Sequence, residues 1–207
     1  MQKPKSYEET KASGDFTPVE LGGHRLIIKQ VSETTTKTTG KPMIVVMFDF
    51  DDSDKQSGYF TKAFKDDIRP EKKWPFAGTK WILTEDENGN CSRNFKTFTT
   101  CVEHSNAGFT TSWGDNFGAQ FKGKKIGGVY GEVHELDNEN KERVKHILRW
   151  FCAVDKADGA AVPNALLLSD HDKEVAEKSK IVYANAVPGP DGFMNIPDGI
   201  DEELPFN

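Results

Sequence analysis

Residues 43–50 constrain the fold more than any other stretch of the chain. The segment is rich in β-branched and aromatic residues, and its apolar side chains recur at every second position, at Ile44, Val46, Phe48 and Phe50. Because successive side chains of a strand point to opposite faces of a sheet, this alternation places all four on one face. The segment is therefore predicted to be a central strand of a mainly β fold.

The remaining elements are predicted from period, composition and turn residues. Residues 14–31 carry an apolar pattern interrupted by Gly22 and Gly23, which predicts a bulge or sharp bend inside a long strand. Apolar residues at three-to-four spacing predict a short amphipathic helix over 94–105. The other predicted elements are a third strand at 58–64, a β-hairpin of 124–136 and 143–154 around the turn 137–140, and a short helix at 172–184.

The second hairpin strand is expected to present two different faces. One phase is mostly apolar and is expected to include core residues, namely Val144, Leu148, Trp150, Cys152 and Val154. The other phase is basic with apolar residues between the charges, namely Arg143, Lys145, Ile147, Arg149 and Phe151. One face is therefore expected to pack on the core and the other to present positive charge.

Three strands, a helix and a closing hairpin, in that order, predict a five-stranded Greek-key barrel of the OB type, with the helix between strands 3 and 4. A small β-sandwich with an added helix is the alternative, because periodicity does not determine strand order. Two long aromatic-rich loops, 65–92 and 106–121, interrupt the pattern. The predicted divisions are a flexible N-terminus at 1–13, the barrel at 14–155, a linker with a short helix at 156–186 and an acidic tail at 187–207.

The net charge of −6 is concentrated near the C-terminus. Residues 156–207 contain four basic and ten acidic residues, so residues 1–155 carry 23 of each sign. From Asp191 onward there are five acidic residues, no Lys or Arg, and an apolar end, which predicts a flexible tether. A tail that only solubilises needs no terminal Phe, so partner binding is predicted for Asp198, Asp201, Glu202, Glu203, Leu204, Pro205 and Phe206.

The sequence contains no recognisable catalytic motif, and we expect neither an enzyme nor a cofactor. The alternative is a divalent metal held for phosphodiester cleavage by Glu132, His134, Glu135 and Asp137, although a solvated strand end is the simpler interpretation. Three cysteines without C-x-x-C spacing favour a reducing compartment. No apolar run is long enough to span a membrane, and the start lacks a signal-peptide core, so a cytoplasmic protein is expected.

Cations and aromatic residues gather where barrel faces and loops would meet. Single-stranded nucleic acid is bound without sequence choice by basic grooves with aromatic rings on which bases stack. The predicted DNA-binding residues are Tyr59, Lys62, Lys72, Lys73, Trp74, Trp81, Lys122, Lys124, Lys125, Arg143, Lys145 and Arg149. Alternatively, Trp74, Trp81 and Trp113 fill the ends of the barrel and the lysines only keep the surface soluble.

Several stretches of the chain resemble the single-stranded-DNA-binding proteins that phages of Gram-positive bacteria encode in their replication and recombination modules. They are GGHRLIIKQV (22–31), GKPMIVV (40–46), FKTF (95–98), EHSNAGF (103–109), GKKIG (123–127) and GFMNIP (192–197). The ending is similar to the acidic tail of bacterial single-stranded-DNA-binding proteins, which closes on Asp-Ile-Pro-Phe, with Glu203 and Leu204 in place of Asp and Ile. Here Asn207 follows Phe206 and moves the terminal carboxylate one residue away.

This resemblance implies an OB fold, coating of single-stranded DNA in the cytoplasm of a bacterial host, and recruitment of replication or recombination proteins by the tail. A phage partner, or the protein's own groove, is an alternative receptor for the tail. The rival hypothesis is an interaction or structural protein of a phage replication module that binds only protein. The oligomeric state, including a homo-oligomer, the preference for DNA or RNA, the site size and the polarity stay open.

Overall fold

The computed structural model describes residues 2, 3, 5, 7, 8 and 17–185, with the backbone alone for 181–185. In this part of the chain the strands are β1 (Gly22–Thr35), β2 (Pro42–Phe50), β3 (Thr79–Leu83), β4 (Lys125–Leu136) and β5 (Glu142–Cys152). The α-helices are α1 (Tyr59–Asp66), α2 (Arg93–Ser105), α3 (Val154–Ala157) and α4 (Asp170–Asn185). Two 3₁₀ turns, η1 (Phe76–Gly78) and η2 (Phe117–Phe121), complete the order. The predicted tail at 187–207 lies outside the described residues.

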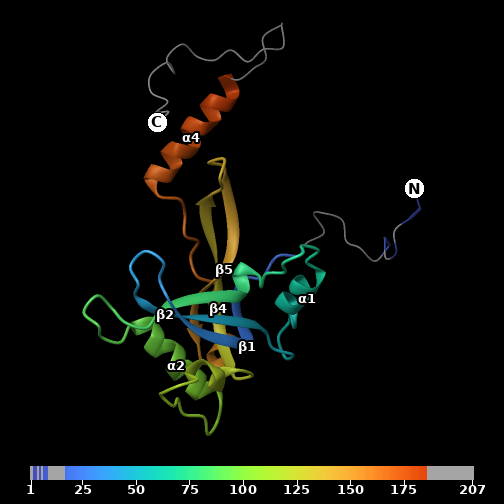
Figure 1. Cartoon of the computed structure of the whole chain (residues 1–207). Coiled ribbons are helices and arrows are strands. Elements are labelled where there is room, and N and C mark those ends of the chain that lie inside the picture. Colours follow the sequence, from blue (N-terminus) through green and yellow to red (C-terminus); the bar gives the residue numbers. More distant parts are fainter. Residues whose placement is uncertain (1, 4, 6, 9–16, 186–207) are drawn as a thin grey trace. The chain divides into compact units, whose positions relative to one another are not determined.

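The strands form one five-stranded antiparallel sheet in the order β3-β2-β1-β4-β5, so the fold is mainly β (Figure 1). A side chain also connects the two edges of this sheet. The ammonium group of Lys80 on β3 donates hydrogen bonds to the carbonyl oxygens of Leu148 (2.9 Å) and Arg149 (3.4 Å) on β5. The sheet therefore curves until its first and last strands approach each other.

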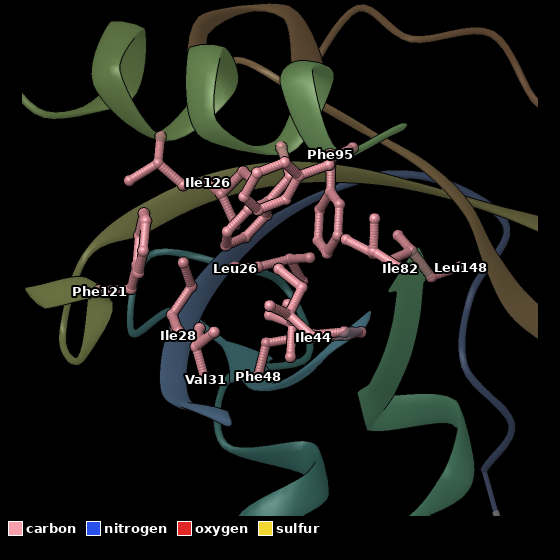
Figure 2. Close-up of a cluster of buried hydrophobic side chains, with 14 of the residues drawn as sticks. Leu26, Ile28, Val31, Ile44, Phe48, Ile82, Phe95, Phe121, Ile126 and Leu148 are labelled. Carbon is pink, nitrogen blue, oxygen red and sulfur yellow. The ribbon is translucent and has the colours of Figure 1, made fainter. Parts of the chain in front are cut away.

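The core lies inside this curved sheet (Figure 2). Ile44, Val46, Phe48 and Phe50 are all buried, which confirms the predicted central strand. The predicted helix at 94–105 is also confirmed, since α2 contributes Phe95, Phe98 and Val102 to the same cluster. The hydroxyl of Ser92 accepts a hydrogen bond from the Phe95 N–H and caps the start of α2.

The predicted third strand at 58–64 is wrong, because these residues begin helix α1. The carboxylate of Asp49, which is fully buried at the end of β2, accepts hydrogen bonds from the N–H groups of Phe60 and Thr61. A carboxylate at this position satisfies amide groups that a helix leaves unpaired in its first turn. The third strand is β3, which forms inside the predicted loop 65–92 and pairs with β2 from Met47 to Met43.

The predicted bulge at Gly22 and Gly23 is also wrong, because these are the first two residues of β1. A Cβ atom on Gly23 would lie 1.7 Å from the carbonyl oxygen of Ala157, so glycine here permits two backbone segments to approach closely. The register of β1 shifts between Ile28 and Gln30 instead, which makes Lys29 the extra residue of the bulge.

The hairpin of β4 and β5 is confirmed, with Asp137 Oδ1 accepting the N–H groups of Glu139 and Lys141 in the turn. The predicted division of β5 into one core face and one basic face is wrong, because Leu148 and Phe151 are both buried while Trp150 is exposed. Residues three apart cannot share a face of a regular strand, so the buried phase changes between them. The predicted helix at 172–184 is confirmed as α4.

The chain divides into two compact units, Met1–Glu132 with His146–Asn164, and Val133–Lys145 with Ala165–Asn207. In the first unit lie β1, β2, β3, α1, α2, α3 and the core. In the second unit the backbone of Leu166 pairs in parallel with Val133, and its carbonyl oxygen accepts the His134 N–H at 2.8 Å.

Candidate nucleic-acid interface

Strand β3 presents two large apolar side chains to solvent. Trp81 is 44% exposed and Leu83 41% exposed, whereas Ile82 between them is buried. The strand register places Trp81 opposite Val45 and Leu83 opposite Met43 on β2. Because paired residues of neighbouring strands share a face, these four side chains form one apolar surface on the side of the sheet away from the core.

Phe76 of η1 extends this surface. Its ring is 63% exposed and lies with its centroid 5.1 Å from that of Trp81, at an interplanar angle of 36°. We call the set Met43, Val45, Phe76, Trp81 and Leu83 the outer face. Two neighbouring exposed aromatic rings on such a surface offer the π-faces on which nucleic-acid bases stack.

The two predicted cations Lys72 and Lys73 precede Phe76 by four and three residues. Both side chains are exposed and have no carboxylate partner among the described residues, and the Lys72 ammonium donates to the Lys65 carbonyl oxygen at 2.6 Å. The nearby acid Asp67 binds the Arg69 guanidinium, whose hydrogen bonds hold the pKa of Asp67 well below its usual range. Lys72 and Lys73 are therefore exposed cations three to four residues before Phe76, next to the exposed Glu71.

Tyr59 and Trp74 serve packing instead of offering open ring faces. The Tyr59 hydroxyl donates to the carbonyl oxygen of Thr17 at 2.8 Å, and burial raises its pKa to about 12. The Trp74 ring packs against Phe64, and its Nε1–H donates to the carbonyl oxygen of Gly78 at 3.0 Å. For Trp74 the structure agrees with the expectation that it fills an end of the fold; Trp81 and Trp113 are instead exposed.

The predicted cations before β4 differ in their surroundings. Lys124 places its ammonium 4.7 Å from the centre of the Phe109 ring, a cation–π contact. Lys125 forms an ion pair with Asp51 at 3.2 Å, while Lys122 is exposed at the end of η2.

The remaining predicted cations are not brought together. Lys62 is exposed on α1 rather than on a strand, and Arg149 donates to the carbonyl oxygen of Asn164 at 3.2 Å. Arg143 and Lys145 belong to the second unit, where both bind the carboxylate of Glu135.

The residues considered as ligands of a divalent metal make other contacts. His134 Nδ1 lies 2.5 Å from a carboxylate oxygen of Glu142, Glu135 binds the two cations just named, and Asp137 accepts the turn amides. Within the described part of the chain, no group of three or more His, Cys, Asp or Glu side chains is arranged to hold a metal ion.

Sequence reasoning did not select Phe76 and Leu83 as site residues. The local signal was weak, because the five residues of β3 do not alternate regularly between apolar and polar side chains. Trp113 was considered only as a core residue, but it is 70% exposed.

No protein-family model matches this chain, and no curated protein matches it. Among the described residues, no helix is long and apolar enough to cross a membrane.

Proposed function

We propose that this protein binds single-stranded DNA without sequence specificity, as a non-enzymatic component of phage DNA replication or recombination. The observation that carries the proposal is the pair of exposed rings, Phe76 and Trp81, on the outer face. Every base has a π-face, so stacking on such rings is tolerant of sequence. Lys72 and Lys73 would neutralise phosphates, which adds affinity that falls as salt concentration rises.

The fold we propose for this function is the OB-type Greek-key barrel. It is supported by the strand order, by the link that Lys80 makes between β3 and β5, and by the position of α2 between β3 and β4. OB barrels bind oligonucleotides on the face of strands 2 and 3. Four of the five residues of the outer face lie on β2 and β3, and we therefore propose this face as the DNA-binding surface.

We also propose that the acidic tail recruits replication or recombination proteins in the cytoplasm of the bacterial host. The residues assigned to this role are Asp198, Asp201, Glu202, Glu203, Leu204, Pro205 and Phe206. A short acidic segment with an apolar end suits a pocket that is apolar at its centre and basic at its rim.

The test uses a labelled oligothymidine and its fluorescence anisotropy with the full chain. The double substitution Phe76→Ala and Trp81→Ala is expected to weaken binding by more than about fivefold, since each stacked base contributes about 1–3 kcal/mol. Leu167→Ala is the control, because Leu167 is also a large exposed apolar side chain but belongs to the second unit. A duplex of equal length should bind much more weakly than the single strand.

If the double variant binds as tightly as the wild-type protein, the outer face is not the site. If the wild-type protein has no salt-dependent affinity for single strands, the proposal fails. The rival function, binding of protein partners only, would then be preferred.

A further inference from the structure

Among the aromatic side chains that the structure describes, Trp113 is the most exposed, yet its ring contacts two others. It is 70% exposed and lies in the loop between α2 and η2. One face of the indole stacks on Phe117, with centroids 5.3 Å apart and planes 18° apart. The edge of Phe95 approaches at 6.1 Å, and both Phe rings are themselves buried. The opposite face of the indole is therefore left to solvent.

The backbone just before Trp113 is fixed by hydrogen bonds. The side-chain amide of Gln120 accepts the Ser112 N–H and donates to the Ser112 carbonyl oxygen, both at 2.8 Å. The Thr111 N–H donates to the Glu103 carboxylate at 2.9 Å. An exposed aromatic ring on a pre-ordered loop loses little conformational entropy when a ligand stacks on it.

Helix α2 carries a cation, Lys96, on the side along which this loop runs. The bond from Thr111 to Glu103 and the contact of Trp113 with Phe95 mean that the loop runs along α2 from its last turn towards its first. Lys96 is seven residues before Glu103 and therefore lies on the same side of the helix as the loop. The side chains of Arg93, Lys96, Thr97 and Thr100 line a shallow, open pocket on α2, with Cys91 and Cys101.

The charges at this pocket favour an anion. Neither Arg93 nor Lys96 forms an ion pair among the described residues, and the lining contains no carboxylate. The acidic groups around it include Glu103, which accepts the Thr111 amide, and the exposed Glu85, whose backbone pairs with that of Cys91. Two cations and threonine hydroxyls are donors suited to a phosphate group.

We infer that Trp113 of the α2–η2 loop, with Lys96 and Arg93 of α2, forms a second nucleotide-binding site for the single strand, separate from the outer face. A base stacks on the open face of the indole, and the neighbouring phosphate binds the two cations. This inference rests on the proposed function, since it extends the length of strand that one protein molecule contacts.

The test compares oligothymidines of increasing length by anisotropy, at several salt concentrations. Trp113→Leu keeps an apolar cover over Phe95 and Phe117 but removes the stacking surface. It is expected to weaken the longer strands about 5- to 100-fold, as expected for one stacked base, and to leave the shortest bound strands unchanged. The double substitution Arg93→Gln and Lys96→Gln should reduce the slope of log K against log salt by about 1.4 for the longer strands. Lys178→Gln, on the exposed surface of α4, is the charge control.

The outcomes separate this inference from the proposed function. If Trp113→Leu and the double variant both bind every length as the wild-type protein does, the second site does not exist while the outer face still can. If the wild-type protein binds no single strand, both ideas fail. The double variant changes only exposed charges, so it tests the site even if Trp113→Leu unfolds.

Discussion

At the scale of single residues, His24 and Asp54 form a buried pair. Both side chains are buried, with His24 Nδ1 3.0 Å from Asp54 Oδ1 and Nε2 3.0 Å from the Glu20 carbonyl oxygen. The imidazole also stacks on Phe50, with ring centroids 4.4 Å apart. Burial would raise the pKa of Asp54, but hydrogen bonds from His24 and from the N–H groups of Gln56 and Arg25 outweigh it, so the pKa is lowered.

This geometry predicts how Asp54→Asn changes stability with pH. The pKa of Asp54 is lower in the folded than in the unfolded protein. The ionised carboxylate therefore stabilises the fold at pH values above its usual pKa of 3.8. Weakening the hydrogen bonds to this buried carboxylate should lower the free energy of unfolding by about 1.5–3 kcal/mol at pH 7.

Urea unfolding of both proteins between pH 7 and pH 3 measures the effect. The wild-type protein loses the contribution of Asp54 as the pH falls through the folded-state pKa, so the two curves should converge in acid. Glu139→Gln is the control, since its exposed pair with Lys141 should contribute little to stability. A difference that stays constant down to pH 3 would contradict this account.

At the scale of elements, β3 depends on Lys80 for its contact with β5. The ammonium is half-buried, and burial together with the charge of Arg149 lowers its pKa. Lys80→Met keeps the apolar stem but leaves the carbonyl oxygens of Leu148 and Arg149 without this donor. We expect a loss of about 1–3 kcal/mol in stability.

Hydrogen exchange checks where that loss occurs. The amides of 79–83 should exchange faster in Lys80→Met than in the wild-type protein, while those of α2 change less. Lys62→Met, which alters an exposed lysine of α1, should leave both regions unchanged. Equal protection of β3 in Lys80→Met and the wild-type protein would show that the edges are held together by other contacts.

Elements with a clear period were predicted correctly, and elements decided by distant contacts were not. β2, α2 and the hairpin of β4 and β5 follow from local pattern and turn residues. α1 begins at Tyr59 because Asp49, which lies ten residues earlier, accepts amides at its start. The spacing of Phe60, Ala63 and Phe64 fits a helix, but the aromatic residues of the segment led to the prediction of a strand.

At the scale of the whole molecule, the uneven charge predicts that the tail weakens DNA binding. The acidic C-terminal segment is tethered to a body of balanced charge, so it competes with phosphates for the cations. Deleting residues 191–207 should tighten binding of oligothymidine on the order of tenfold at low salt. The difference should shrink at about 1 M salt, where the screening length falls to about 3 Å.

Anisotropy titrations of the full chain and the truncated chain measure this effect. A chain of full length with Asp198, Asp201, Glu202 and Glu203 changed to Asn or Gln separates charge from length and should match the truncated chain. Unchanged affinity of the truncated chain at low salt would show that the tail does not compete with DNA.

The sequence by itself determined the β class, the helix before the hairpin, the central strand and the division between a neutral body and an acidic end. These follow from local periodicity and composition, which are properties of contiguous residues. It also supplied the candidate cations and aromatic rings, but not their surroundings. Only the tertiary structure decided that Trp74 is packed while Trp81 and Trp113 are exposed, and that Phe76 lies beside Trp81. The physical reason is that exposure and pairing depend on contacts between segments distant in sequence, which local pattern does not encode.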